Sequence, residues 1–129
     1  MVIDTSAVLA VLQNEPERDT FIRFIVDAPI RRMSAATYVE AGIVLESRFG
    51  SAGTHQLILF VSRAEIQIAQ LDLEQAEIAL DAYRRFGKGR HAAGLNYGDC
   101  FSYALATVKE EPLLYKGSDF PETDIQSVE

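Results

Sequence analysis

Four carboxylates stand at positions where an α/β protein can gather side chains for chemistry. Asp4 directly follows the apolar pair Val2-Ile3, and Asp119 follows the last apolar segment of the chain. Glu40 lies among small apolar residues of a predicted helix, and Asp99 falls in the first turn of another, where the helix dipole favours an anion. Carboxylates that are crowded together repel one another unless a cation lies between them. We therefore expect these four side chains to form a cation site.

The chemistry that suits such a site is hydrolysis of a phosphodiester. Mg²⁺ prefers oxygen ligands and keeps several of its waters, so two to four carboxylates suit it well. A bound ion can lower the pKa of water, place it in line with a phosphodiester and stabilise the leaving oxygen. The His and Cys residues have no spacing typical of a zinc site. The pattern therefore favours a Mg²⁺-dependent hydrolase.

Each carboxylate taken alone also has a purely structural interpretation. Asp4 can simply cap the following helix, and Asp99 can be only a partner of the helix dipole. Glu40 can be a solvated or salt-bridged side chain, and Asp119 can be an ordinary turn residue. The combination carries the hypothesis, because three of the four positions are strand ends or helix starts that an α/β fold brings to one rim.

Short apolar strands alternate with helices along the chain. The expected strands are 2–3, 30–33, 66–71 and 112–115, and the expected helices are 7–13, one between Pro16 and Pro29, 35–48, 57–64, 73–86 and 97–109. This alternation predicts a three-layer α/β/α fold around a mostly parallel central sheet. Ligand sites in such sheets lie beyond the carboxyl ends of the strands, which is where we expect Asp4 and Asp119.

Length and composition narrow the class of protein. The 129 residues suit one domain, residues 1–129, and a hydrophobic fraction of 48% is enough for one core. A formal charge of −7 argues against a general nucleic-acid coat protein, but not against a nuclease with clustered carboxylates. The single cysteine, Cys100, excludes an internal disulfide and fits a reducing compartment. Because no segment is typical of a signal peptide or a membrane span, we expect a soluble cytoplasmic protein with no membrane contact.

Basic residues gather near the end of the predicted helix 73–86 and in the loop that follows it: Arg84, Arg85, Lys88 and Arg90. A charge run of this kind is often only a solvated face, and basic residues also suit a helix C-terminus. Alternatively, the run contacts RNA phosphates beside the acidic pocket, which positions the strand without reading its sequence. Lys116, next to the acidic turn, is a weaker RNA-binding candidate of the same type. Both interpretations stay open at this point.

Four segments resemble the PIN-domain nucleases, and among them the VapC toxins of bacterial toxin–antitoxin pairs. The opening Met-Val-Ile-Asp-Thr-Ser-Ala is similar to the family's strand that delivers Asp-x-Ser, and Ser-Ala-Ala-Thr-Tyr-Val-Glu (34–40) is similar to its helix with an acidic residue. Asn-Tyr-Gly-Asp-Cys-Phe-Ser-Tyr-Ala (96–104) resembles the segment with the third acid, and Pro-Leu-Leu-Tyr-Lys-Gly-Ser-Asp-Phe (112–120) resembles the closing strand and its acidic turn. The resemblance spans nearly the whole chain in the family's order and spacing.

The resemblance implies a PIN fold, a divalent metal (Mg²⁺, with Mn²⁺ as the other option) and the endoribonuclease activity of a toxin. It implies Asp4 and Asp99 as metal ligands, with Glu40 completing the set. Ser6 is then a hydroxyl that orients a carboxylate or a water. The family also implies a homodimer, and a cognate VapB-type antitoxin that blocks the site.

The chain departs from the family at the closing turn. Many members carry two acids there, but here the earlier position is Gly117, and only Asp119 remains as the fourth candidate catalytic acid. Its role therefore stays open: it can contact the metal through water or contact none.

The acidic residues have three other possible interpretations. A phosphatase of the haloacid-dehalogenase type needs a second Asp two residues after the first, but that position is Ser6. A response-regulator receiver needs a phosphoacceptor Asp after a middle strand, and the region around Phe49-Gly50 has none. A non-catalytic PIN-like module that binds nucleic acid or protein stays an alternative, because one acid of the closing turn is missing. The sequence identifies neither the RNA target nor the number of metal ions.

Overall fold

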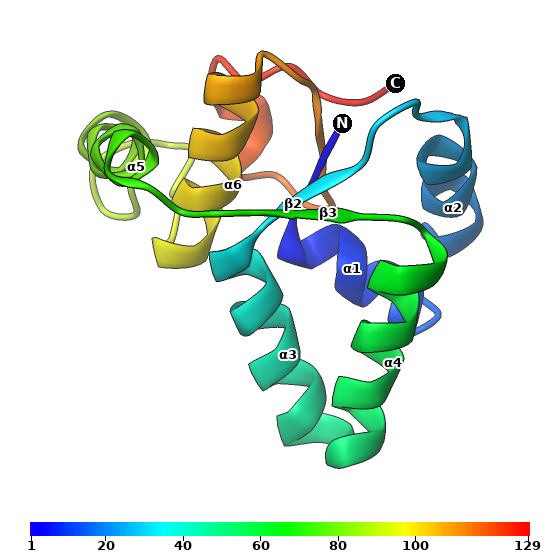
Figure 1. Cartoon of the computed structure of the whole chain (residues 1–129). Coiled ribbons are helices and arrows are strands. Elements are labelled where there is room, and N and C mark those ends of the chain that lie inside the picture. Colours follow the sequence, from blue (N-terminus) through cyan, green and yellow to red (C-terminus); the bar gives the residue numbers. More distant parts are fainter.

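Short strands and helices alternate along the whole chain in the computed structural model, which describes residues 1–129 (Figure 1). In chain order the elements are β1 (Val2–Ile3), α1 (Thr5–Leu12), α2 (Arg18–Asp27), β2 (Arg32–Ser34), α3 (Ala35–Phe49), α4 (Ser51–Arg63), β3 (Gln67–Ala69), α5 (Leu73–Phe86), α6 (Tyr97–Lys109), β4 (Leu113–Leu114) and a 3₁₀ turn (Phe120–Glu122). None of the helices has the length and apolarity that a bilayer crossing demands.

The four strands form one sheet in the order β3-β2-β1-β4, and every pair is parallel. The expected three-layer α/β/α fold around a mostly parallel sheet is thus confirmed. β1 lies between β2 and β4, so the strand order reverses beside it. In an open parallel sheet this reversal leaves a crevice at the carboxyl ends of the strands, and the residue that follows β1 there is Asp4.

Alternate residues of the strands pack against different helices, as the pleat of a strand requires. Ile3, Met33 and Leu114 belong to a core shared with residues of α1, α2, α3 and α4. Val2 and Leu113 belong to a second core shared with residues of α5 and α6. Both cores include residues of the strands that end at the crevice. Packing on the two faces of the sheet therefore fixes the position of the crevice.

Polar N-caps begin the helices that surround the crevice. Asp4 caps α1, Ser34 caps α3 and Asn96 caps α6, each through a side-chain oxygen that accepts a backbone N–H of the first turn. Such caps satisfy N–H groups that have no partner inside the helix. They also set the helix start, and with it the direction in which the residues of the first two turns point.

Helices α3 and α4 form a hairpin that extends away from the sheet (Figure 1). Gly50 joins them with φ +65°, a backbone conformation that residues other than glycine rarely adopt. Gly53 lets the helices approach closely, because a Cβ at this position would lie 2.3 Å from the carbonyl oxygen of Leu45. The hairpin is therefore a tight unit that carries Glu40 on the α3 side.

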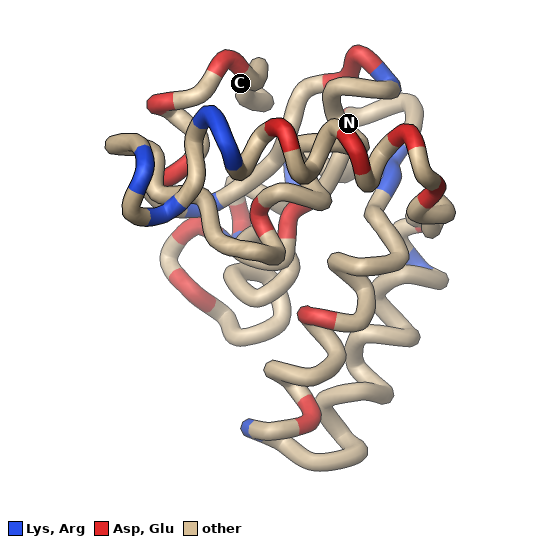
Figure 2. The backbone as a smooth tube through the Cα atoms, turned by 90° about the vertical axis from the view of Figure 1, so that its left-hand side faces the viewer, with Lys and Arg blue, Asp and Glu red and all other residues tan.

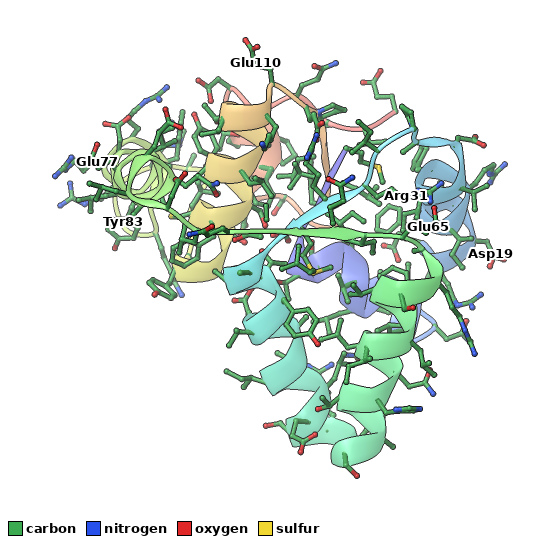
Figure 3. The ribbon with its side chains drawn as sticks, viewed as in Figure 1. Asp19, Arg31, Glu65, Glu77, Tyr83 and Glu110 are labelled. Atoms are coloured by element: carbon green, nitrogen blue, oxygen red, sulfur yellow. The ribbon has the colours of Figure 1, made fainter.

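Several element boundaries differ from the expected ones. The second helix begins at Arg18 instead of at Pro16, and the helix expected at 57–64 is the second part of α4, which already begins at Ser51. The strand expected at 30–33 comprises residues 32–34, because Ser34 is both the last residue of the strand and the N-cap of α3. Helix α5 lies at the outer edge of the molecule, where Glu77 points away from the body (Figure 3).

Candidate metal centre of four carboxylates

Asp4 is the most firmly held of the four carboxylates. Its side chain is buried, with 2% of the residue exposed. Oδ2 accepts hydrogen bonds from the backbone N–H of Ser6 (3.0 Å) and from the Ser6 hydroxyl (2.7 Å). Oδ1 accepts one from the hydroxyl of Ser102 (2.6 Å). Both oxygens are therefore fixed in direction by donors from α1 and α6.

Asp99 lies in the first turn of α6, in a capping box with Asn96. The Asp99 N–H donates to Asn96 Oδ1 (2.9 Å), and the Asn96 N–H donates to Asp99 Oδ2 (3.1 Å). The pKa of the Asp99 carboxyl is raised to about 7, mainly by burial and also by the neighbouring Asp4 and Asp119, against the lowering effect of the Asn96 backbone N–H. The Asp119 carboxyl lies within hydrogen-bonding reach of Asp99. Three aspartates from β1, α6 and the closing turn therefore share one crevice.

Glu40 reaches the same crevice from α3. The hydroxyl of Thr5, the neighbour of Asp4, donates a hydrogen bond to Glu40 Oε1. On the other side the carboxylate rests against Gly98, the neighbour of Asp99: a Cβ at Gly98 would lie 2.1 Å from Glu40 Oε2. Because Gly98 has no side chain, the Glu40 carboxylate fits between the segment that carries Asp4 and the segment that carries Asp99.

No basic side chain neutralises this cluster: none of the ion pairs in the structure includes Asp4, Glu40, Asp99 or Asp119. The neighbouring Lys116 pairs with Glu15 and, at 3.4 Å, with Glu17. The Lys116 backbone N–H instead donates to the Ser6 hydroxyl at 2.9 Å, which in turn donates to Asp4. Uncompensated negative charge in a half-buried crevice is what a bound cation would relieve.

The donor set fits a hard divalent cation, because all four side chains offer carboxylate oxygens and no nitrogen or sulfur. In the present side-chain positions, no three Asp, Glu, His or Cys side chains are placed so that they could hold one metal ion. Asp4 is fixed by three hydrogen bonds, so gathering ligands around one ion requires the Glu40 and Asp99 side chains to turn toward it.

The basic run at the end of α5 divides into two kinds of residue. Arg85 is anchored: it pairs with Asp124 at 3.1 Å and with Asp81 at 3.6 Å. Arg84, Lys88 and Arg90 are exposed and take part in no ion pair. Figure 2, viewed from the α5 side, shows basic positions gathered toward one end of this face, apart from most of the acidic ones. Three cations are thus available to an external anion.

Sequence reasoning missed five residues that hold the acids in place: Thr5, Thr37, Asn96, Gly98 and Ser102. The spacing Asn-x-x-Asp at the start of α6 is a recognisable capping box and could have identified Asn96. Ser102 follows Asp99 by three residues, so the two side chains lie on the same face of α6. Nothing local pointed to Thr37, since its partner comes from another helix.

Replacing Gly98 with Ala is expected to displace Glu40 without harming the fold. The clashing atoms are the far end of a flexible side chain, and Ala favours helices over Gly by about 1 kcal/mol. We expect unchanged or slightly raised urea stability together with metal binding weakened by about tenfold, by analogy with other changes that disturb the support of ligands. Calorimetric titration with Mn²⁺ measures this, and undiminished affinity would contradict the placement of Glu40.

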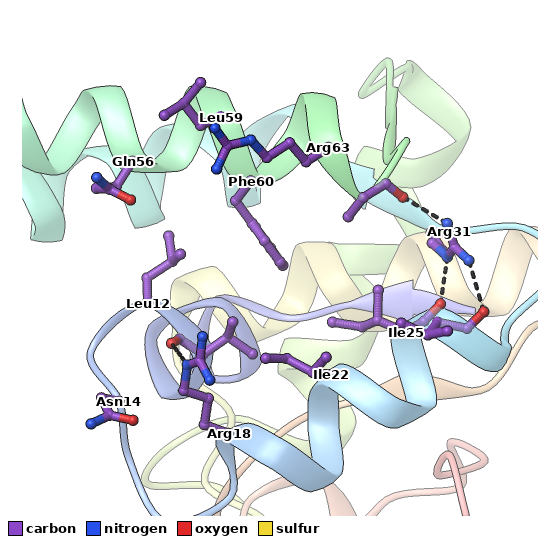
Figure 4. A pocket seen from close by; sticks show the side chains of 13 residues that line it. Leu12, Asn14, Arg18, Ile22, Ile25, Arg31, Gln56, Leu59, Phe60 and Arg63 are labelled. Atoms are coloured by element: carbon purple, nitrogen blue, oxygen red, sulfur yellow. Dashed lines mark hydrogen bonds between the residues drawn. The ribbon is translucent and has the colours of Figure 1, made fainter.

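A groove of about 750 Å³ lies between α2 and α4, and none of the four acids lines it. Its walls are apolar, with Ile22, Leu59 and Phe60 among them, and Arg18 and Arg63 lie at its edges (Figure 4). The guanidinium of Arg31 closes one end by donating to carbonyl oxygens at the C-terminus of α2 and after α4. The groove combines apolar walls with a cationic rim.

Comparisons with known proteins add to this geometry. The family model described as PIN domain matches residues 1–126. A ribonuclease VapC of Mycolicibacterium smegmatis is 53% identical over 128 residues, which cover 99% of this chain and 99% of that protein. The crystal structure of Mycobacterium tuberculosis VapC20, a toxin that cleaves the sarcin–ricin loop, superposes with a TM-score of 0.80 at 17% identity and covers 98% of this chain and 97% of that one. A toxin–antitoxin complex from Klebsiella pneumoniae gives 0.72 at 14% identity and covers 95% and 92%.

Proposed function

Because this chain belongs to the PIN-domain family, and within it to the VapC ribonucleases, we propose that it is a Mg²⁺- or Mn²⁺-dependent endoribonuclease that acts as the toxin of a toxin–antitoxin pair. The observation that carries the metal dependence is the state of Asp99. Its carboxyl interacts with Asp4 and Asp119 and has no basic partner, and its pKa is raised to about 7. A divalent cation is the group that lets all of these acids be ionised together.

Asp4, Asp99 and Glu40 are the residues that would hold the ion, and Asp119 joins them through Asp99. When bound, the ion supplies Lewis-acid chemistry, which polarises the phosphodiester and lowers the pKa of water. Asp4 offers an oriented ligand because Ser6 and Ser102 fix its plane. Because the pKa of the Asp99 carboxyl is raised to about 7, a cation bound beside it would favour its ionised form near neutral pH.

Removal of metal tests this function directly. The purified chain is expected to cleave RNA with Mg²⁺ or Mn²⁺, to lose cleavage in EDTA and to regain it when Mn²⁺ is restored in excess. Single-turnover cleavage of a labelled RNA measures the rate in each state. Full activity in EDTA would contradict the metal-dependent assignment. Mn²⁺ binding without cleavage of any RNA would instead favour the alternative, a non-catalytic binding module.

Arg84, Lys88 and Arg90 are the residues we propose for contact with RNA phosphates, since they are exposed and free of ion pairs. Phosphate contacts of this kind position a strand and make binding weaker as salt rises. Arg85 and Lys116 contribute less, because acidic neighbours already engage both side chains.

A VapB-type antitoxin is the partner that we propose for the groove between α2 and α4. The Klebsiella pneumoniae neighbour is itself a toxin–antitoxin complex. An apolar groove with Arg18 and Arg63 at its rim suits an amphipathic segment that carries acidic residues, because apolar burial and charge complementarity then act together. The homodimer stays a prediction; an apolar pocket between α5 and α6, with the exposed Leu80 and Tyr97 in its lining, fits a second copy.

Replacing Leu59 with Asp is expected to weaken antitoxin binding by about a hundredfold, because it places a charge on an apolar wall that the partner would cover. RNA cleavage by the free protein should stay unchanged. The matched control is Ile58→Asp on the same helix, which is 48% exposed and lies outside the groove. Binding is measured with a purified VapB-type antitoxin. Equal affinity of both variants would contradict the assignment of this groove.

A further inference from the structure

Two buried hydroxyls form a relay that ends on Asp4. The hydroxyl of Ser102 donates to Asp4 Oδ1 at 2.6 Å, and the hydroxyl oxygens of Thr37 and Ser102 lie 3.3 Å apart. Ser102 is 0% exposed and Thr37 1% exposed, so water does not replace either bond. An unpaired hydroxyl at such a depth costs free energy, which favours keeping both bonds made.

The chemistry of the three groups fixes the direction of the relay. An ionised carboxylate can only accept hydrogen bonds, so the single hydroxyl proton of Ser102 goes to Asp4. Ser102 can then only accept from Thr37, whose proton therefore points toward Ser102. Hydrogen bonds in such a chain polarise one another, so the Thr37 hydroxyl strengthens the bond that Ser102 makes to Asp4.

The relay also determines which atom of Asp4 is left for a ligand. A carboxylate offers about four lone-pair positions, two on each oxygen. The N–H and hydroxyl of Ser6 occupy both positions on Oδ2, and Ser102 occupies one on Oδ1. One position on Oδ1 remains. With Ser102 in place, Asp4 presents a single acceptor in a single direction.

Three elements that carry acids meet in this relay. Asp4 follows β1, Ser102 lies on α6 three residues after Asp99, and Thr37 lies on α3 three residues before Glu40. A shift of α3 or α6 relative to β1 would break one of the two hydrogen bonds. The relay thus couples the orientation of Asp4 to the placement of the helices that carry the other two candidate ligands.

We infer that Ser102 and Thr37 are positioning residues of the metal centre: they hold Asp4 as a one-oxygen ligand through Oδ1 and thereby set the affinity for the divalent cation. This inference rests on the proposed metal-dependent function. It concerns buried hydroxyls and not the acids themselves, so it can fail while the metal site stands.

The test is calorimetric titration of the full chain with Mn²⁺ alone. Loss of a group that supports a metal ligand lowers affinity by about 10- to 100-fold, which is the range expected for Ser102→Ala. Thr37→Val keeps the side-chain shape and removes only the outer donor, so its loss should be smaller, about threefold. The control is Ser127→Ala, which removes a hydroxyl 2.6 Å from the Tyr115 hydroxyl and outside the site. Its Mn²⁺ affinity should equal that of the wild type.

Urea unfolding without metal and RNA cleavage at increasing Mn²⁺ separate positioning from a merely structural role. Cleavage by Ser102→Ala should recover as Mn²⁺ is raised, since the defect lies in affinity. Wild-type affinity in Ser102→Ala overturns the inference, as does a cleavage defect that Mn²⁺ does not rescue. If Ser102→Ala does not fold, wild-type affinity in Thr37→Val overturns it. Failure of the wild type to bind Mn²⁺ overturns the proposed function itself.

Discussion

Replacing Asp4 with Asn is expected to reduce RNA cleavage by at least about a hundredfold while the fold stays intact. The physical reason lies in the three donors around this side chain. In one orientation, the amide oxygen of Asn faces the N–H and hydroxyl of Ser6. The NH₂ group then takes the position of Oδ1, the one atom with a free acceptor position. An NH₂ group cannot bind a cation. If the amide is turned the other way, its NH₂ meets the N–H of Ser6, and the buried donors oppose each other. The opposed donors disfavour this second orientation, so the favoured one turns the NH₂ group toward the cation and removes the Asp4 ligand.

A charge-matched control separates this effect from a change in net charge. Asp19→Asn removes the same charge from a carboxyl whose side chain is 93% exposed and distant in sequence from every acid of the site. Single-turnover cleavage at saturating Mn²⁺ and far-ultraviolet circular dichroism should give normal values for Asp19→Asn, and normal dichroism without cleavage for Asp4→Asn. Wild-type cleavage by Asp4→Asn would refute the assignment of the centre.

The metal-free protein is expected to become more stable when Asp99 is replaced with Asn. Folding raises the pKa of this carboxyl from 3.8 to about 7, so the folded state binds the proton more tightly than the unfolded state. That contribution is fully present below pH 4 and is lost as pH rises through 7. Asn cannot ionise, yet its amide oxygen can still accept the N–H of Asn96. After allowance for solvent screening, we expect a gain of about 1–2 kcal/mol at pH 8 in EDTA.

Urea unfolding at pH 5 and pH 8 measures this difference, which should shrink at the lower pH. Addition of Mn²⁺ should stabilise the wild type more than Asp99→Asn. Asp124→Asn gives a control of opposite sign, since the hydroxyl of Tyr103 and the guanidinium of Arg85 lower the pKa of Asp124. Its stabilising contribution is present above pH 4 and is lost in acid, so this variant should lose stability at pH 8. A destabilised Asp99→Asn at pH 8 would contradict the origin of the raised pKa.

Sequence reasoning reached the acids but not what holds them. Asp4 and Asp119 follow strands, and Asp99 begins a helix, so the rule that ligands gather beyond the strand ends was enough to bring them together. The supporting hydroxyls have no such rule. Thr37 and Ser102 lie 65 residues apart, and their contact exists only because α3 and α6 pack against the same strand. A bond between two helices depends on tertiary packing, which no local pattern encodes.

In the fold, too, features set by local sequence patterns could be predicted, and features set by tertiary packing could not. Helix α6 could be predicted at 97–109 because its capping residue and its apolar positions agree. Strand β3 was expected at 66–71 but comprises only Gln67–Ala69, since the pairing with β2 covers three residues. The α2–α4 groove was not foreseen at all, because its two walls are separated in the sequence by β2 and α3 and meet only in the folded protein.

Arg31 gives the groove a shape that does not depend on an occupant. Its guanidinium joins the Val26 carbonyl of α2 and the Ala64 carbonyl after α4, each at 2.9 Å, so the two walls are tied together within the isolated chain. A segment that enters the groove therefore bears almost the whole entropy loss of ordering by itself. When that segment leaves, α2 and the end of α4 are expected to keep their places, so the next segment meets a groove that is already formed.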